Sequence, residues 1–129
     1  MRRLSLLSLL CVPLGCSDSG DSGLSRSDAG AELSVADLGK ARELYASNNC
    51  ALCHGSQGQG APPAGPALRG LGDFWDQAQL RAFLADPVTA LKHDPRLAEQ
   101  AKQYMMPMQI PDQLTESGRA LLAKLLLSW

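Results

Sequence analysis

The sequence has 129 residues and a mass of 13.7 kDa, which suits one small domain and excludes a large multidomain enzyme. Twelve basic and thirteen acidic residues leave a formal net charge of -1, without the basic excess that is typical of nucleic-acid-binding proteins. Aromatic residues make up only 5% of the chain although 45% is hydrophobic, so the core is either aliphatic or filled by a group other than protein.

Residues 1–15 have the pattern of a secretory signal peptide. Two arginines follow Met1, and the apolar stretch after them is too short to span a bilayer. The stretch ends in Gly15 and Cys16, which resembles the lipobox of bacterial lipoproteins. The resemblance implies that Cys16 is acylated and attaches the mature protein to a membrane. Pro13 departs from the lipobox pattern, and ordinary cleavage nearby, which would release a protein without lipid, is the alternative.

Residues 16–33 are predicted to form a flexible tether. They are rich in Ser, Gly and Asp and show no apolar repeat, so they cannot bury enough surface to offset the entropy lost on folding. The tether from Ser17 onward carries four acids against one base, whereas residues 34–129 hold nine acids and nine bases. The acidic excess therefore lies in the tether, and residues 34–129 are expected to form the folded domain.

Helices and no convincing strand are predicted in the folded domain. They span about Val35–Asn49, Gln77–Ala85, Pro95–Gln103 and a last helix that is capped by Thr115 and ends near Ser128. Ser34 and Asp37 have the form of a capping box, and Pro87 is expected to stop the second helix. Frequent glycine and proline between Cys50 and Asp73 predict a long loop. The fold class is therefore all-α, with about four helices and long loops.

The segment Cys50-Ala51-Leu52-Cys53-His54 directly follows the first predicted helix. C-x-x-C-H is the attachment signature of c-type haem. Two cysteines three positions apart lie on one side of a helical turn, so their sulfurs can reach two vinyl groups on one porphyrin edge. The adjacent His54 then turns its imidazole toward the iron. The motif therefore predicts one covalent haem c, with Cys50 and Cys53 as thioether positions and His54 as an axial ligand.

Three other interpretations of the two cysteines compete with haem attachment. A disulfide between Cys50 and Cys53 is possible in an exported protein. A thioredoxin-like redox pair would need a βαβ context, which the sequence lacks. A zinc site would need His54 and His93 as well, and His54 beside Cys53 could hardly complete a tetrahedron. With Cys16 taken by lipid and the signal peptide removed, haem attachment leaves no thiol over.

A sixth ligand for the iron is expected from the methionine-rich segment near residue 106. Met105, Met106 and Met108 lie in a predicted loop, and a thioether sulfur favours ferrous iron and raises its reduction potential. Two of these three methionines are expected to fill gaps in the packing. His93 is a weaker alternative, because a lone histidine at a helix end is usually solvated.

Residues from about Val35 to Trp129 resemble a class I monohaem cytochrome c domain. The segments that carry the resemblance are Ala41–Tyr45, Cys50–Gly55, Gly58–Gly60, Gly65–Leu71 and Leu80–Pro87. The resemblance implies a small all-α domain packed around the haem. It also implies that the Pro66 carbonyl accepts a hydrogen bond from His54 Nδ1.

The family usually has its methionine ligand in a Met-Pro pair before the last helix, which maps onto Met106. Met108 is an alternative, and Met105 a weaker one. The chain departs from the family pattern at Ala41, where glycine is usual, and at Leu125, where an aromatic residue is common. Candidate partners of the haem propionates are Arg69, Trp75 and Gln57.

These features predict a one-electron carrier rather than an enzyme. The resemblance implies export to the periplasm and brief contacts with redox partner proteins, such as membrane respiratory complexes, but not with nucleic acid. Two alternatives stay open: a haem-based sensor or enzyme with a displaceable sixth ligand, and a cytochrome subunit of a larger oxidoreductase complex. Without haem the long loops would have little to pack on, so the apo chain is expected to be poorly folded.

Overall fold

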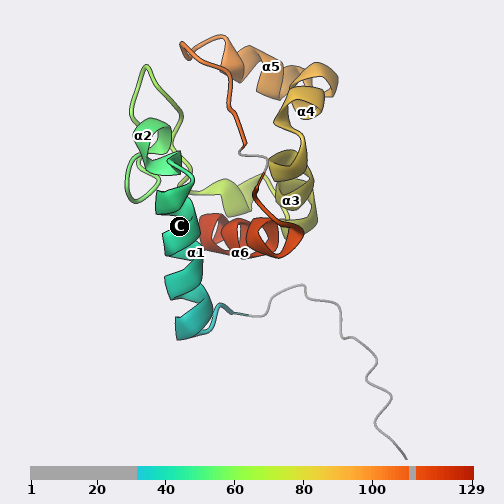
Figure 1. Cartoon of the computed structure of the whole chain (residues 1–129). Coiled ribbons are helices and arrows are strands. Elements are labelled where there is room, and N and C mark those ends of the chain that lie inside the picture. The colour runs from blue at the N-terminus through green and yellow to red at the C-terminus, as the bar shows by residue number, and fades with distance from the viewer. Residues whose placement is uncertain (1–31, 111–112) are drawn as a thin grey trace, which may run out of the picture.

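The computed structural model describes residues 32–110 and 113–129, which are helical apart from their loops (Figure 1). The elements are α1 (Val35–Ser47), α2 (Cys50–His54), the 3-10 turn η1 (Leu71–Asp73), α3 (Gln77–Ala85), α4 (Pro87–His93), α5 (Pro95–Ala101) and α6 (Glu116–Leu127). Within these ranges, the extended pairing is limited to an isolated bridge between Ala61 and Gly65. The all-α fold class is confirmed. The expected signal peptide and all but the last two residues of the expected tether lie outside the described ranges.

The four predicted helices are present, and two short helices, α2 and α4, were not among them. Helix α2 and the turn η1 interrupt the segment expected to be loop throughout. Pro87 was expected only to stop α3, and this was wrong in part, because it also begins α4. The Asp86 side chain accepts a hydrogen bond from the Thr89 amide at 2.9 Å, and Pro87 at the first helical position has no amide hydrogen to leave unpaired.

The N-terminal caps have the residues that the sequence indicates. Ser34 Oγ accepts a bond from the Asp37 amide at 3.1 Å, but the Asp37 carboxylate accepts from the Ser34 hydroxyl instead of completing the capping box. A complete capping box begins α3, between Asp76 and Gln79. Thr115 accepts from the Gly118 amide at 3.1 Å and begins α6. Each cap satisfies an amide that the helix itself leaves unpaired.

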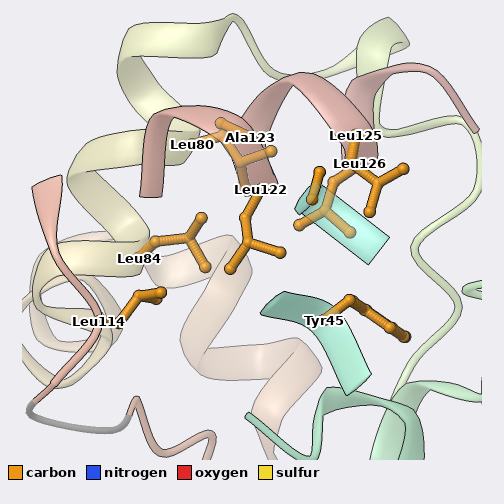
Figure 2. Packing of buried hydrophobic residues seen from close by; sticks show 9 residues of the cluster. Tyr45, Leu80, Leu84, Leu114, Leu122, Ala123, Leu125 and Leu126 are labelled. Carbon is orange, nitrogen blue, oxygen red and sulfur yellow. The ribbon is translucent and has the colours of Figure 1, made fainter. Parts of the chain in front are cut away.

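Helix α6 lies across α1 on one side and against α3 on the other, and the core forms where the three helices meet (Figure 1, Figure 2). The buried core residues are Ala41, Tyr45, Leu80, Leu84, Leu114, Leu122, Ala123, Leu125 and Leu126. Full burial of one leucine side chain stabilises the fold by about 1.5–3 kcal/mol, before the entropy cost of folding is counted. Apart from Tyr45 the buried core is thus aliphatic, which is one of the two arrangements that the low aromatic content allowed.

The crossing of α1 and α6 uses small residues on both helices. Ala41 is fully buried, and so is Leu125 on the facing helix. Gly118 is also buried, and a Cβ there would lie 3.0 Å from Leu114 Cδ1 and 3.7 Å from Leu44 Cδ1. Glycine at 118 therefore leaves room for the Leu114 side chain beside α6, whereas its distance to Leu44 on α1 is that of an ordinary contact.

The aromatic contact at this crossing comes from outside α6. Trp129 follows the helix and packs edge-to-face on Tyr45, with ring centroids 5.0 Å apart and an interplanar angle of 84°. Leu125 occupies the position where an aromatic residue is common in the family. Trp129 therefore supplies the large ring that α6 itself lacks.

Helices α4 and α5 form a separate wall on the far side of α3 (Figure 1). Helix α4 packs on α3 and on α5, and in the described ranges neither α4 nor α5 packs against α1 or α6. The wall is therefore joined to the core through α3. Among the described residues, no helix is long and apolar enough to cross a membrane.

Candidate haem site

The attachment motif forms its own short helix because two asparagines turn the chain sharply after α1. Asn48 ends α1, and its side-chain amide donates to the Leu44 carbonyl at 2.8 Å. Asn49 then adopts a left-handed conformation with φ 59°, which asparagine tolerates better than most residues. The change of direction starts α2 at Cys50, so that the whole C-x-x-C-H motif lies on one helical turn.

Cys50 and Cys53 are half-buried free thiols, so the structure contains no disulfide between them. Burial raises the pKa of the Cys50 thiol, a backbone hydrogen bond opposes this, and the nearby Cys53 adds to the rise. Among residues 32–110 and 113–129, no three His, Cys, Asp or Glu side chains gather closely enough to hold a metal ion. The structure thus supports neither the disulfide nor the zinc interpretation.

His54 is buried, with 8% of its surface exposed, and its ring is held by one strong contact. Nδ1 lies 2.8 Å from the carbonyl oxygen of Pro66, the contact that the family resemblance implies. Because a carbonyl can only accept, Nδ1 must carry the hydrogen, and in the neutral ring the lone pair is left on Nε2. With its tautomer and orientation fixed by this bond, the His54 imidazole can bind a metal through Nε2.

The loop that carries Pro66 folds back closely on α2. A Cβ at Gly65 would lie 2.5 Å from the Cys53 carbonyl oxygen, and one at Gly60 would lie 2.8 Å from the Ala67 amide nitrogen. The Gly60 amide also donates to the His54 carbonyl at 2.7 Å. Glycine at 65 therefore permits the approach that brings Pro66 within reach of the His54 ring.

The motif lines a cavity of about 440 Å³ between α2, α3, α5 and the segment before α6. Such a volume is within the usual range of small-molecule and cofactor sites. The side chains of Cys50, Cys53 and His54 contribute to one part of its wall. The rest is largely apolar and includes Phe83, Leu84, Leu91, Leu97, Tyr104, Ile110, Leu114 and Leu122.

The three candidate methionines differ in where the structure places them. Met106 and Met108 line the cavity with His54, but Met105 does not. Met108 is half-buried and packs against the hydrophobic core, whereas Met106 is 65% exposed and is not among the residues packed against that core. The Met106 side chain therefore does not contribute to the packing of the core, whereas the Met108 side chain does.

Other residues considered from the sequence lie away from the cavity. His93 is exposed at the end of α4. Arg69 donates to the Gln57 side chain at 3.1 Å, and Trp75 packs on Phe83 with centroids 5.4 Å apart; of these residues, only Phe83 lines the cavity. The apolar wall from α4 and α5 was not predicted, because α4 itself was not. Leu91 and Leu97 are the residues in the sequence that could have indicated this wall.

The donor set fits a covalently attached haem. Two thiols, one buried imidazole with a free Nε2 and a thioether line the same largely apolar cavity, and both soft sulfur and imidazole nitrogen are ligands that haem iron accepts. An apolar wall of this kind also suits a large flat ring.

Comparison with known proteins agrees with this site. The family model for Cytochrome c matches residues 38–129, which is well over half of the chain. No curated protein and no solved structure gives a match. A cytochrome c domain implies covalently bound haem c and haem-based electron transfer. The chain therefore belongs to the cytochrome c family.

Proposed function

We propose that the protein is a one-electron carrier with a single haem c, bound through Cys50 and Cys53 and ligated by His54 and Met106. The observation that carries the proposal is that all four side chains line one cavity, in which the imidazole is already held through Nδ1. When bound, the haem supplies an iron that alternates between ferrous and ferric states. A carrier needs no substrate-reacting groups beyond these ligands.

The protein side chains would hold and tune the iron rather than react with anything. The Pro66 carbonyl keeps the His54 ring in one orientation and one tautomer, and the hydrogen bond raises the donor strength of Nε2. Apolar residues around the cavity exclude water, which favours the less charged ferrous site. A thioether opposite the imidazole works in the same direction.

Met106 is proposed as the second iron ligand because this residue lines the cavity and does not pack against the core. Met108 is the alternative, since it also lines the cavity. Met105 does not line the cavity, which disfavours it.

The test is absorption spectroscopy on the purified holoprotein. We expect the ferric methionine-sulfur charge-transfer band to disappear in Met106→Ala and to persist in the matched variants Met108→Ala and Met105→Ala. Loss of the band in Met108→Ala alone would move the ligand to Met108. Ready binding of carbon monoxide by the unmutated ferrous protein would instead favour a sensor or enzyme with a displaceable ligand.

We further propose that the domain is exported to the periplasm and held at a membrane by a lipid on Cys16. Support comes from the signal-like residues 1–15 and the lipobox-like end of that segment, all of which precede the described residues. An acidic tether would then let the domain move between redox partner proteins, either as a free carrier or as part of an oxidoreductase complex. Cys16→Ser should shift the protein from the membrane fraction to the soluble fraction, and an unchanged distribution would contradict the anchor.

A further inference from the structure

Trp129 contacts both arms of the loop that carries the partner of His54. A Cβ at Gly58 would lie 2.5 Å from Cζ3 of the Trp129 ring and closer still to Cε3, so the ring lies directly against the Gly58 backbone. The Trp129 carbonyl accepts a hydrogen bond from the Gly70 amide at 3.2 Å. One residue therefore touches the beginning and the end of the loop.

The two arms are joined to each other between these two contacts. The Leu68 amide donates to the Gly58 carbonyl at 2.8 Å, and the Ala61 amide donates to the Gly65 carbonyl at 3.1 Å. Pro66 lies between these two rungs. The two bonds therefore restrain the backbone on both sides of Pro66, and with it the position of the Pro66 carbonyl oxygen.

Tyr45 extends the same support to the motif itself. It is 3% exposed and packs edge-to-face on the Trp129 ring, and its hydroxyl donates to the Gly55 carbonyl at 2.7 Å. Gly55 directly follows His54. The aromatic pair therefore holds both partners of the bond between His54 and Pro66, through Gly55 on one side and Gly58 on the other.

We propose that Trp129 is a positioning residue that keeps the Pro66 carbonyl on His54 Nδ1, acting through Gly58 and, with Tyr45, through Gly55. The inference rests on the proposed ligation of haem iron by His54 and goes beyond it. Trp129 lies outside the described helices, and the proposal gives it control of the hydrogen bond between His54 and Pro66. That bond sets the donor strength of the imidazole. If Trp129 only packed in the core, its removal would weaken the hydrogen bond between His54 and Pro66 no more than other hydrogen bonds of the protein.

The test measures how fast the His54 Nδ1 hydrogen exchanges with solvent, by NMR on the reduced, histidine-labelled holoprotein. We expect Trp129→Ala to speed this exchange at least tenfold more than the control Leu80→Ala. Leu80 is a buried core residue on α3, a helix that packs on α6 but not on α1 or α2, so its truncation reports general loss of stability. Trp129→Phe, which keeps a flat ring, should restore most of the protection.

If Trp129→Ala yields no holoprotein, Trp129→Leu takes its place, since leucine keeps apolar bulk without the flat ring. Its His54 Nδ1 hydrogen should also exchange at least tenfold faster than that of Leu80→Ala. Similar exchange rates in the Trp129 and Leu80 variants would overturn the role of Trp129 and leave the proposed function intact. A wild-type protein that lacks a protected His54 Nδ1 hydrogen would likewise overturn the role of Trp129, whereas a wild-type protein that attaches no haem would contradict the proposed function itself.

Discussion

The two sides of the cavity are built very differently. On the histidine side, α2 and residues 55–70 are joined by backbone hydrogen bonds, by glycines in close contact and by the pair Tyr45 and Trp129. On the methionine side, residues 104–110 make two backbone hydrogen bonds to other residues that the structure describes, from the Tyr104 amide to Ala101 and from the Met105 amide to Pro63. The segment follows α5, which packs on α4 among the described helices.

The difference indicates that the proposed ligand His54 is held by the fold, whereas the proposed ligand Met106 is held by a segment that can open locally. Regions with few buried contacts open at lower free energy than the core of the same protein. A bond from iron to Met106 would therefore contribute much of the order on its own side. His54, in contrast, is oriented by protein contacts alone. The following predictions test this contrast, from the largest expected effect to the smallest.

Amide hydrogen exchange should separate the two sides directly. In the holoprotein we expect the Gly60 and Leu68 amides, which are bonded to His54 and Gly58, to exchange at least ~100-fold more slowly than the Tyr104 and Met105 amides. This ratio corresponds to a difference in opening free energy of about 2.7 kcal/mol. Equal protection of the two pairs of amides would contradict the difference between the two sides of the cavity.

Gly65→Ala should damage the histidine side selectively. Its Cβ would meet the Cys53 backbone, which cannot move away cheaply, so we expect a loss of about 1–3 kcal/mol in the free energy of unfolding. Gly39→Ala is the matched control: nothing lies within 4 Å of its Cβ, and alanine suits the interior of α1, so a gain of about 0.4–1 kcal/mol is expected. Denaturant unfolding of both holoproteins gives the comparison, and equal stabilities would refute the close approach at residue 65.

Tyr45 should make the histidine side sensitive to alkaline pH. Burial is the main cause that raises its pKa to about 12, and charge on Cys50 and Cys53 adds to it. Once those sulfurs are thioethers they carry no charge, and burial alone remains. Because the folded pKa lies above the ordinary value of 10.0, this contribution to stability is complete below pH 10.0 and is lost as pH rises toward about 12.

The variant Tyr45→Phe isolates this effect. It cannot ionise, so the free energy of unfolding of the wild type should fall more than that of the variant as pH rises above 10.0. Near neutral pH the variant should be less stable by about 1 kcal/mol, because the Gly55 carbonyl loses its hydrogen bond. Parallel pH profiles for the two proteins would mean that Tyr45 is not buried as described.

Much of the histidine side follows from local sequence, whereas the methionine side does not. The capping residues give the beginning of α1, α3 and α6, and the C-x-x-C-H spacing places the two cysteines on one side of a helical turn. Local signals cannot distinguish Met106 from Met108, because the two differ in long-range packing rather than in residue type. The same reason hides the contact between Trp129 and Gly58, which are far apart in the sequence.

Helix α4 shows how a local signal can be misread. Proline after Ala85 ends one helix, since it disfavours helical geometry in the residue before it. The same proline is also favoured at the first position of a new helix when a capping residue precedes it, and Asp86 is such a residue. Recognition of Asp86-Pro87 as a beginning, like Asp94-Pro95 before α5, would have predicted the apolar wall of the cavity.

Asp86→Ala should therefore loosen the methionine side and leave the histidine side unchanged. Loss of the cap bond to Thr89 is expected to speed exchange of the Ala90 amide several-fold, and of Tyr104 to a smaller extent, with no change at Leu68. Asp86→Asn keeps a capping oxygen and should resemble the wild type near neutral pH. Hydrogen bonds from Thr89 lower the pKa of Asp86, so the capping contribution of aspartate is present above its ordinary pKa of 3.8 and is lost as pH falls through the lower folded value. The asparagine variant should lack that acid sensitivity, and equal acceleration at Leu68 and Ala90 in Asp86→Ala would show that the two sides open together.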